Sequence, residues 1–254
     1  MRASHRRVLG EMLGSAALAS IVVGSGIAAQ QLSPTDTGLQ LLENALVTAM
    51  GLTVLILVFA PISGAHFNPV VTLVDVAVGG RTWRDAAAYL SAQVLGCIGG
   101  TVLANAMFDG PLITWSETDR LTPAHFLAEV VATAGLIFVI FALARTDYSK
   151  IVAAAVGLYI GAAYFFTSST SFANPAITIG RMFTDTFAGI APSSAPGYVL
   201  AQLIGGALGL AAVLLLVPRV TTASQRASPP ISTNIDSAVG SVHEHELAAD
   251  RRED

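Results

Sequence analysis

The chain carries the same unusual segment twice. Residues 66–73 are HFNPVVTL and residues 172–179 are FANPAITI, so an Asn-Pro pair opens an apolar run in both places. A second match follows at a similar distance, because YLSAQVLG at 89–96 has the counterpart YVLAQLIG at 198–205. The chain therefore consists of two related halves, and its fold has to place both Asn-Pro segments in equivalent positions.

Six apolar stretches are long enough to cross a lipid bilayer as helices, which takes about 17–25 residues. They are Val8–Ala29, Leu39–Ala60, Ala86–Met107, Phe126–Ala144, Ile151–Thr167 and Val199–Val217. The chain is 53% hydrophobic and only 12% charged, whereas a soluble domain carries about 25% charged residues. This composition excludes a soluble binding module and predicts an all-α membrane protein in the lipid bilayer, with no nucleic-acid partner.

Three of these stretches fall in each half, at about residues 8–107 and 124–217. Because three is odd, the second half must cross the membrane in the opposite sense, which gives an inverted 3+3 repeat. Asn is a good helix N-cap and Pro is tolerated in the first helical turn. Asn68 and Asn174 therefore start two re-entrant half-helices of about a dozen residues, which enter from opposite faces and meet at the midplane.

This meeting point suits an uncharged solute that carries hydroxyl groups. Two helix N-termini concentrate positive partial charge there and repel cations. The Asn amides supply donors, and the loop carbonyls around Ser63–Ala65 and Ser171–Ala173 supply acceptors, since re-entrant backbone is tolerated where it lines a wet cavity. The pattern predicts a passive channel in which small neutral solutes pass in single file.

Paired polar residues inside the spans are predicted to support these loops. Glu11 and Glu129 stand at matching places, and this pairing favours bracing of loop N–H groups over the alternative of proton carriage. Gln93 and Gln202 fit the same interpretation. Close crossing of the helices is expected at Gly96, Gly99, Gly205 and Gly209.

The basic residues predict that both termini are cytoplasmic. With the N-terminus inside, eleven of the 13 Lys and Arg residues fall on the cytoplasmic side. A signal peptide is the alternative interpretation of the first span, but Glu11 inside it and the repeat argue against that. A channel domain at 1–218 is followed by a polar stretch at 219–254, which predicts a disordered tail.

The sequence offers nothing that indicates an enzyme. No nucleophile–base pair or metal-ligand cluster is evident, and the single Cys97 excludes an intrachain disulfide. His243 and His245 in HEHE could bind a metal weakly, but a solvated acidic tail is the preferred interpretation, so no metal or cofactor is expected. A proton-coupled transporter would share the inverted repeat and broken helices, yet the midplane pair is Asn–Asn, with no ionisable group.

The segments SGAHFNPVVTL and STSFANPAITIGR resemble the paired Asn-Pro-Ala boxes of the major intrinsic protein family, the aquaporins and aquaglyceroporins. The resemblance covers about Val8 to Val217. It implies six tilted helices with two half-helices, one pore per subunit, usually a homotetramer, and a place in the cell inner (plasma) membrane. The residues that it carries over to the pore are Asn68, Pro69, Val70, Asn174, Pro175 and Ala176, with Val70 in place of the usual Ala.

The chain departs from this family at the selectivity filter. An Arg normally follows the second Asn by three residues, and here that residue is Ile177; Thr178 stands where glycerol-conducting members commonly have Asp. The other filter positions, taken from alignment, are Ser171, Ala162 and either Met50 or Thr48. A filter without Arg should be broader and less polar. This favours glycerol-like polyols, urea or neutral metalloid acids such as arsenite, and bacterial members similar to this chain are associated with arsenical transport. An ordinary water channel with a relaxed filter is the alternative.

Two basic residues have roles that the sequence leaves open. Arg181 lies four residues beyond Ile177, one helical turn outward. It either reaches back over the filter or is held away by Asp185, a further four residues along. In the first half, the position that matches Arg181 is occupied by Asp75. His66 either lines the cytoplasmic side of the pore or forms a hydrogen bond within its own loop.

Overall fold

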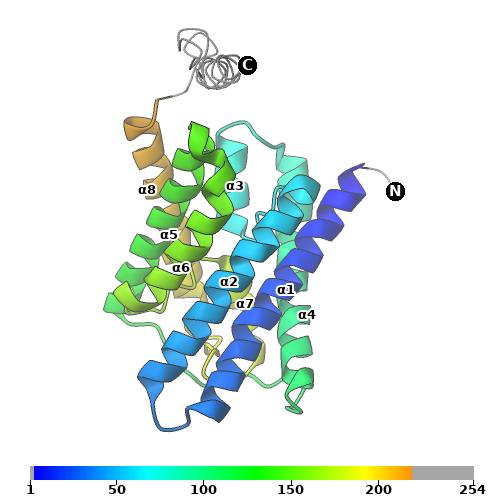
Figure 1. Ribbon diagram of the computed structural model, residues 1–254, viewed down its shortest axis with the longest axis vertical. Helices are drawn as coiled ribbons and strands as arrows, with labels where there is room; N and C mark the ends of the chain where they lie inside the picture. The colour runs from blue at the N-terminus through cyan, green and yellow to red at the C-terminus, as the bar shows by residue number, and fades with distance from the viewer. Residues whose placement is uncertain (1–2, 219–254) are drawn as a thin grey trace, which may run out of the picture. The chain divides into compact units, whose positions relative to one another are not determined.

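A computed structural model describes residues 3–218, and the expected tail at 219–254 lies outside the described residues. Six long helices form the bundle in Figure 1: α1 (Ala3–Leu32), α2 (Thr37–Ser63), α4 (Trp83–Met107), α5 (Pro123–Ala144), α6 (Val152–Phe166) and α8 (Ala195–Leu216). All six are long and apolar enough to cross a membrane, α6 together with most of the preceding 3-10 turn η1 (Asp147–Ile151). The predicted all-α architecture with six spans is therefore confirmed.

The long helices begin at ordinary capping residues. Asp36, Thr82 and Thr122 each accept a hydrogen bond from a backbone N–H in the first turn of α2, α4 and α5. Such caps satisfy donors that have no partner inside the helix. Helices α2, α4 and α5 therefore begin two or three residues before the predicted apolar stretches, because their caps lie at polar positions that hydropathy does not count.

The two halves pack in the same way, with α1 against α4 in the first and α5 against α8 in the second. Glycines allow this approach: a Cβ at Gly96 would collide with the Met12 carbonyl, and one at Gly205 would lie 2.5 Å from the Val130 carbonyl. The prediction for Gly99 is wrong, since a Cβ there would meet open space. Its neighbour Gly100 makes the contact instead, against the backbone of α1.

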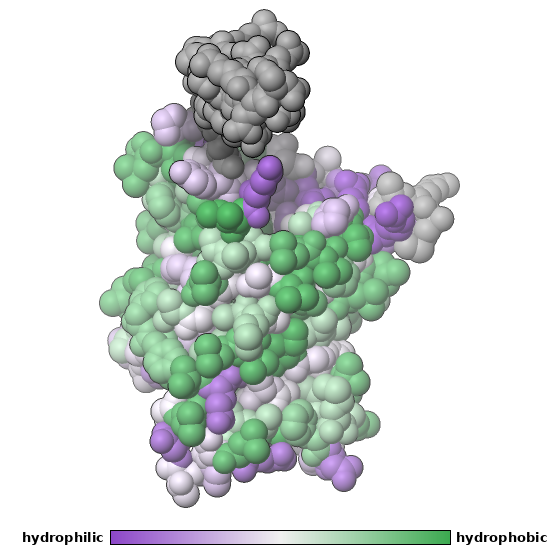
Figure 2. All heavy atoms as spheres, viewed as in Figure 1, coloured by the Kyte–Doolittle hydropathy of each residue, from purple (hydrophilic) through white to green (hydrophobic). Residues whose placement is uncertain are grey.

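The flanks of the bundle are apolar. Figure 2 shows hydrophobic side chains along the sides of the molecule, while strongly polar ones gather toward its two ends. On α2, for example, Val54, Leu57 and Val58 are each more than half exposed. A surface of this kind is stable against lipid and not against water, so the chain is a multi-pass membrane protein.

The two half-helices are α3 (Pro69–Ala77) and α7 (Pro175–Gly180), and the 3-10 turn η2 (Arg181–Phe183) continues α7. Both are shorter than the dozen residues predicted. The chain leaves α7 early because Gly180 lies directly against the Cys97 backbone of α4 and because Thr184 donates a hydrogen bond to Asn105 at 2.8 Å. These contacts turn the apolar residues that follow into a packed loop.

Candidate functional site: a pore between two half-helices

Asn68 and Asn174 face each other across the start of the two half-helices. The Asn68 amide nitrogen donates to the Ala173 carbonyl at 2.8 Å, and the Asn174 amide nitrogen donates to the Phe67 carbonyl at 2.8 Å. Each amide group carries two N–H bonds, and these contacts use one of them. The structure thus brings the two predicted Asn residues together and leaves each with a further N–H.

The same side chains cap their own helices. The Asn68 side-chain oxygen accepts from the Val70 N–H at 2.9 Å, and that of Asn174 accepts from the N–H groups of Ala176 and Ile177 at 3.0 and 3.3 Å. Each Asn therefore links its own half-helix to the loop that precedes the other. This arrangement fixes both amide groups in place, as a rigid donor pair requires.

Two buried carboxylates hold the re-entrant loops in matching ways. Glu11 accepts four hydrogen bonds, and so does Glu129, each from one serine hydroxyl, two loop N–H groups and one glutamine amide. The donors to Glu11 are Ser63, His66, Phe67 and Gln93 at 2.6–3.0 Å, and the donors to Glu129 are Ser169, Phe172, Ala173 and Gln202 at 2.6–2.9 Å. With four acceptor sites filled, neither carboxylate has a vacant site for a mobile proton, which favours the bracing role.

The loops adopt backbone conformations that non-glycine residues rarely take. Ala65 and Phe67 have φ of 51° and 49°, and their counterparts Ser171 and Ala173 have φ of 49° and 47°. Each left-handed residue costs about 1–2 kcal/mol, so the braces have strain to offset. The conformation presents a run of loop residues to the cavity, as a pore lined by carbonyl groups needs.

The carbonyl acceptors begin one residue later than predicted. The Ser63 carbonyl is already bonded, to the Tyr89 hydroxyl at 2.7 Å and to Arg81 at 2.5 Å. Among the described residues, no donor is bonded to the carbonyls of Gly64, Ala65 and His66 in the first loop or of Ser171 and Phe172 in the second. All five residues line the cavity, so these carbonyls are the acceptors available to a solute.

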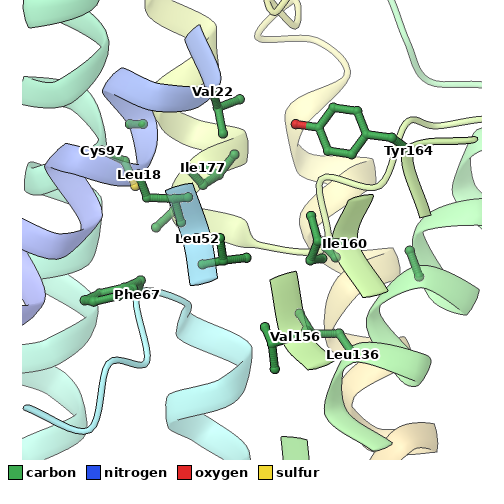
Figure 3. Close-up of a cluster of buried hydrophobic side chains, with 14 of the residues drawn as sticks. Leu18, Val22, Leu52, Phe67, Cys97, Leu136, Val156, Ile160, Tyr164 and Ile177 are labelled. Carbon is green, nitrogen blue, oxygen red and sulfur yellow. The ribbon is translucent and has the colours of Figure 1, made fainter. Parts of the chain in front are cut away.

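A cavity of about 290 Å³ runs along the two loops and both Asn residues. Its walls are mostly aliphatic, with Leu18, Leu52, Val156 and Ile160 among the lining residues. Figure 3 shows these side chains around an open space, with the Tyr164 hydroxyl pointing across it. The cavity is therefore a largely apolar passage with polar groups at a few defined places.

Of the predicted filter residues, Ile177 and Ser171 line the cavity and two others do not. Met50 is 60% exposed on the outer face of α2, and Ala162 is likewise exposed on α6. Thr48 of α2 and Tyr164 of α6, each two residues from the exposed residue on its helix, do line the cavity, and their hydroxyl oxygens lie 3.2 Å apart. Thr48 was one of the two alternatives for α2, whereas sequence reasoning missed Tyr164.

The rest of the Asn-Pro boxes supports the pore from behind. Pro69, Pro175 and Ala176 are buried and do not line the cavity. Val70 is 2% exposed and packs where Gly206 of α8 has no side chain, since a Cβ there would collide with Val70 Cγ1. Gly206 thus explains how the larger Val fits at a position where the family usually has Ala.

The α3 end of the cavity carries an ion pair. Asp75 lies 3.1 Å from the Arg81 guanidinium and 3.6 Å from His66 Nε2. His66 lines the cavity and its Nδ1 also lies 3.0 Å from the Thr72 hydroxyl. Both roles considered for His66 are therefore compatible with its position.

The α7 end carries Arg181, which is 2% exposed and lines the cavity. Its guanidinium carbon lies 3.5 Å from the centroid of the Phe172 ring, and its Nε donates to the Ala188 carbonyl. The pairing with Asp185 is not formed, because that carboxylate accepts from the Glu117 N–H at 3.1 Å. Of the two positions considered for Arg181, the structure has the one beside the cavity.

Comparisons with known proteins agree with this architecture. Residues 2–171 match the family model described as Major intrinsic protein. The chain is 46% identical to Aquaglyceroporin AqpS of Rhizobium meliloti (strain 1021) over 224 residues, which is 88% of this chain and 95% of the relative. It is 26% identical to the Glycerol uptake facilitator protein of Bacillus subtilis (strain 168) over 232 residues, 79% of this chain and 81% of that protein.

A solved structure has the same fold. The X-ray structure of the aquaglyceroporin from Plasmodium falciparum matches with a TM-score of 0.64 at 22% sequence identity, and the match covers 83% of this chain and 95% of that one. At this identity the likeness establishes the arrangement of helices.

Proposed function

Because this chain belongs to the major intrinsic protein family, whose aquaglyceroporin members are channels and not enzymes, we propose that it is a passive transmembrane channel for small uncharged solutes, with glycerol-like polyols as its main substrate class. Water would pass as well. The names of its relatives in Rhizobium meliloti and Bacillus subtilis support the same class of solute.

The observation that carries the proposal is the position of Ile177. It lines the cavity on α7, three residues after Asn174, where the family normally places an Arg. An aliphatic side chain there removes donors and charge from the narrowest part expected of the pore, and it leaves an apolar wall for the carbon skeleton of a polyol. A strict water channel would gain nothing from such a wall.

The polar groups suit the hydroxyls of the same solute. The second N–H of Asn68 and of Asn174 would donate to a solute oxygen, and the unbonded carbonyls from Gly64 to His66 would accept from its hydroxyl hydrogens. A solute that passes in single file would exchange one set of these hydrogen bonds for the next. The positive ends of α3 and α7 would meanwhile repel cations and interrupt a proton wire.

Neutral metalloid acids such as arsenite are a second proposed substrate class. They present several hydroxyl groups on a compact centre, as glycerol does, so the same donors and acceptors would serve them. The wide aliphatic wall at Ile177 would admit a centre broader than a water molecule. The resemblance to bacterial members without the filter Arg supports this class.

We also propose that both termini are cytoplasmic and that the chain forms a homotetramer in the plasma membrane. Figure 1 places the start of α1 and the ends of α2 and α8 at one end of the bundle, and the distribution of Lys and Arg supports a cytoplasmic position for that end. In the 18-residue apolar stretch that would cross the membrane, only 17% of α2 is buried within the subunit, against 56% of α1. Neighbouring copies would cover part of that surface.

Stopped-flow light scattering on proteoliposomes tests the proposal. In an impermeant osmolyte, vesicles that contain the protein should shrink faster than empty vesicles. In a hyperosmotic step of glycerol or arsenite, they should shrink and then reswell faster than empty vesicles, because the solute enters. Fast shrinkage without faster reswelling in either solute would instead establish the alternative, a water channel with a relaxed filter. Uphill solute movement driven by an imposed pH gradient would establish a proton-coupled transporter.

A further inference from the structure

The α7 end of the cavity holds a buried cation without a counter-charge. Arg181 is 2% exposed, lines the cavity and, within residues 3–218, forms no ion pair. Among the described residues, its side chain forms one hydrogen bond, from Nε to the Ala188 carbonyl. A guanidinium has five N–H donors, so most of the donor capacity of Arg181 is unused by the protein.

A second arginine adds to the positive charge at this place. Arg120 lies with its guanidinium carbon 5.6 Å from the centroid of the same Phe172 ring, and it donates to the carbonyls of Gly189 and Phe187 at 2.6 and 2.8 Å. Arg120 also forms no ion pair among the described residues. Two like charges beside one ring repel each other, so a nearby anion would lower the energy of both.

The carboxylates in this region are engaged elsewhere. Glu129 already accepts four hydrogen bonds from the second loop and Gln202. Asp185 accepts from the Glu117 backbone, and Asp119 accepts from the Ser194 hydroxyl. An unpaired charge away from bulk water is costly. Within residues 3–218, the remaining N–H groups of Arg181 therefore have no protein acceptor and can bind an acceptor that enters the cavity.

Other residues that line the same cavity carry hydroxyl groups. Ser171 lines the cavity, is 3% exposed, and its hydroxyl has no hydrogen-bond partner among the described residues. The bonded hydroxyls of Thr48 and Tyr164 line the cavity too. A planar guanidinium with free N–H groups binds an oxyanion through two parallel hydrogen bonds. Hydroxyl groups complete such a site without adding charge.

From this geometry we infer that Arg181 is the centre of an oxyanion-binding site in the pore, and that a small oxyanion bound there competes with neutral solutes for passage. The binding itself is independent of what the channel conducts. The competition rests on the proposed function, because it needs a conducted solute to be measured.

Binding is tested by thermal unfolding of the purified protein in detergent, with nitrate as the probe and gluconate, a much bulkier anion, as the reference at equal ionic strength. Relative to gluconate, near-saturating nitrate should raise Tm of the wild type by about 2–4 °C more than that of Arg181→Gln. Arg84→Gln removes the same charge from an exposed position and should respond as the wild type does. Equal responses of the wild type and Arg181→Gln would overturn the site.

Arg181→Lys keeps the test available should the Gln variant fail to fold. It retains the charge but loses the planar fork, so its nitrate response should be smaller than that of the wild type. An undiminished response in Arg181→Lys, with Arg181→Gln unfolded, would show that charge alone acts and would contradict a built oxyanion site.

Competition is tested in proteoliposomes by glycerol flux in nitrate against gluconate. Nitrate should lower wild-type flux about twofold at half-saturation, whereas the flux of Arg181→Gln, taken relative to its own value in gluconate, should not change. Flux that is insensitive to nitrate, with the Tm response intact, would confine the site to the vestibule and overturn the competition. Absence of glycerol flux in the wild type would refute the proposed function and leave the binding result standing.

Discussion

Asn68 and Asn174 each donate a hydrogen bond to the loop that precedes the other, at the same distance of 2.8 Å. Each also caps its own half-helix through the side-chain oxygen. The two half-helices are therefore tied to each other by two side chains that also line the cavity. Structure and function at this point cannot be changed separately.

Replacement of Asn68 by Asp tests this coupling. A carboxylate still caps α3, but it cannot donate to the Ala173 carbonyl and it places a charge against that oxygen. We expect Asn68→Asp to lose about 2 kcal/mol of stability and most of the solute flux. Asp36→Asn, an exposed N-cap on α2, should be nearly neutral because Asn and Asp cap equally well. Denaturation in detergent measures both variants, and equal stability would refute the cross-link.

Glu11→Gln and Glu129→Gln test the braces. An amide has one acceptor oxygen in place of two and brings an NH₂ group against loop N–H donors. Each variant should lose roughly 3 kcal/mol, because hydrogen bonds to a charged acceptor are worth about 1.5–3 kcal/mol each. Glu117→Gln changes an exposed side chain and should stay within about 0.5 kcal/mol of wild type. If both brace variants are as stable as Glu117→Gln, the bracing account is wrong.

Val70 and Gly206 should behave as a compensating pair. Gly206→Ala forces a methyl group into Val70 and should cost about 1–3 kcal/mol. Val70→Ala removes buried methyl groups and should cost a similar amount. In the double variant the new methyl group at position 206 fills the space left by Val70, so the two losses should be clearly less than additive. Additive losses in a double-mutant cycle would contradict direct packing between these positions.

Cysteine labelling distinguishes the two candidate filter positions on α2. In a Cys97→Ser background, Thr48→Cys should react with a charged, membrane-impermeant thiol reagent and lose glycerol flux, because Thr48 lines the cavity. Met50→Cys faces the outer surface and should keep its flux after the same treatment. The background variant alone supplies the control. Block of Met50→Cys together with full activity of Thr48→Cys would reverse the assignment.

Much of this fold could be predicted because the same motifs recur in both halves of the sequence. Matched spacing of Asn-Pro, Glu and Gln in two halves predicts an inverted pair of half-helices and their supports. The filter residues of α2 and α6 carry no such local motif. On α2 the sequence left Thr48 and Met50 both open, and on α6 the assignment to Ala162 missed Tyr164 by two residues. Two residues turn a side chain about 200° around a helix.

Neither the length of α7 nor the position of the Arg181 side chain could be predicted from the sequence. The end of α7 depends on contacts with α4, more than 70 residues away, at Asn105 and Cys97. Arg181 had a local partner available in Asp185, and only the folded loops show that Phe172 and the Ala188 carbonyl take it instead. Local spacing favours Asp185 as the partner, whereas the three-dimensional packing determines which groups contact Arg181.

The central claim, that the aliphatic residue at position 177 makes this a channel for solutes larger than water, is tested most directly by Ile177→Arg. Water and glycerol flux should be compared in proteoliposomes for the wild type, Ile177→Arg and Ile177→Leu. We expect Ile177→Arg to lower glycerol flux about tenfold, a change of about 1.4 kcal/mol in the barrier, while water flux persists. Ile177→Leu should conduct both as the wild type does. Undiminished glycerol flux through Ile177→Arg would contradict the account.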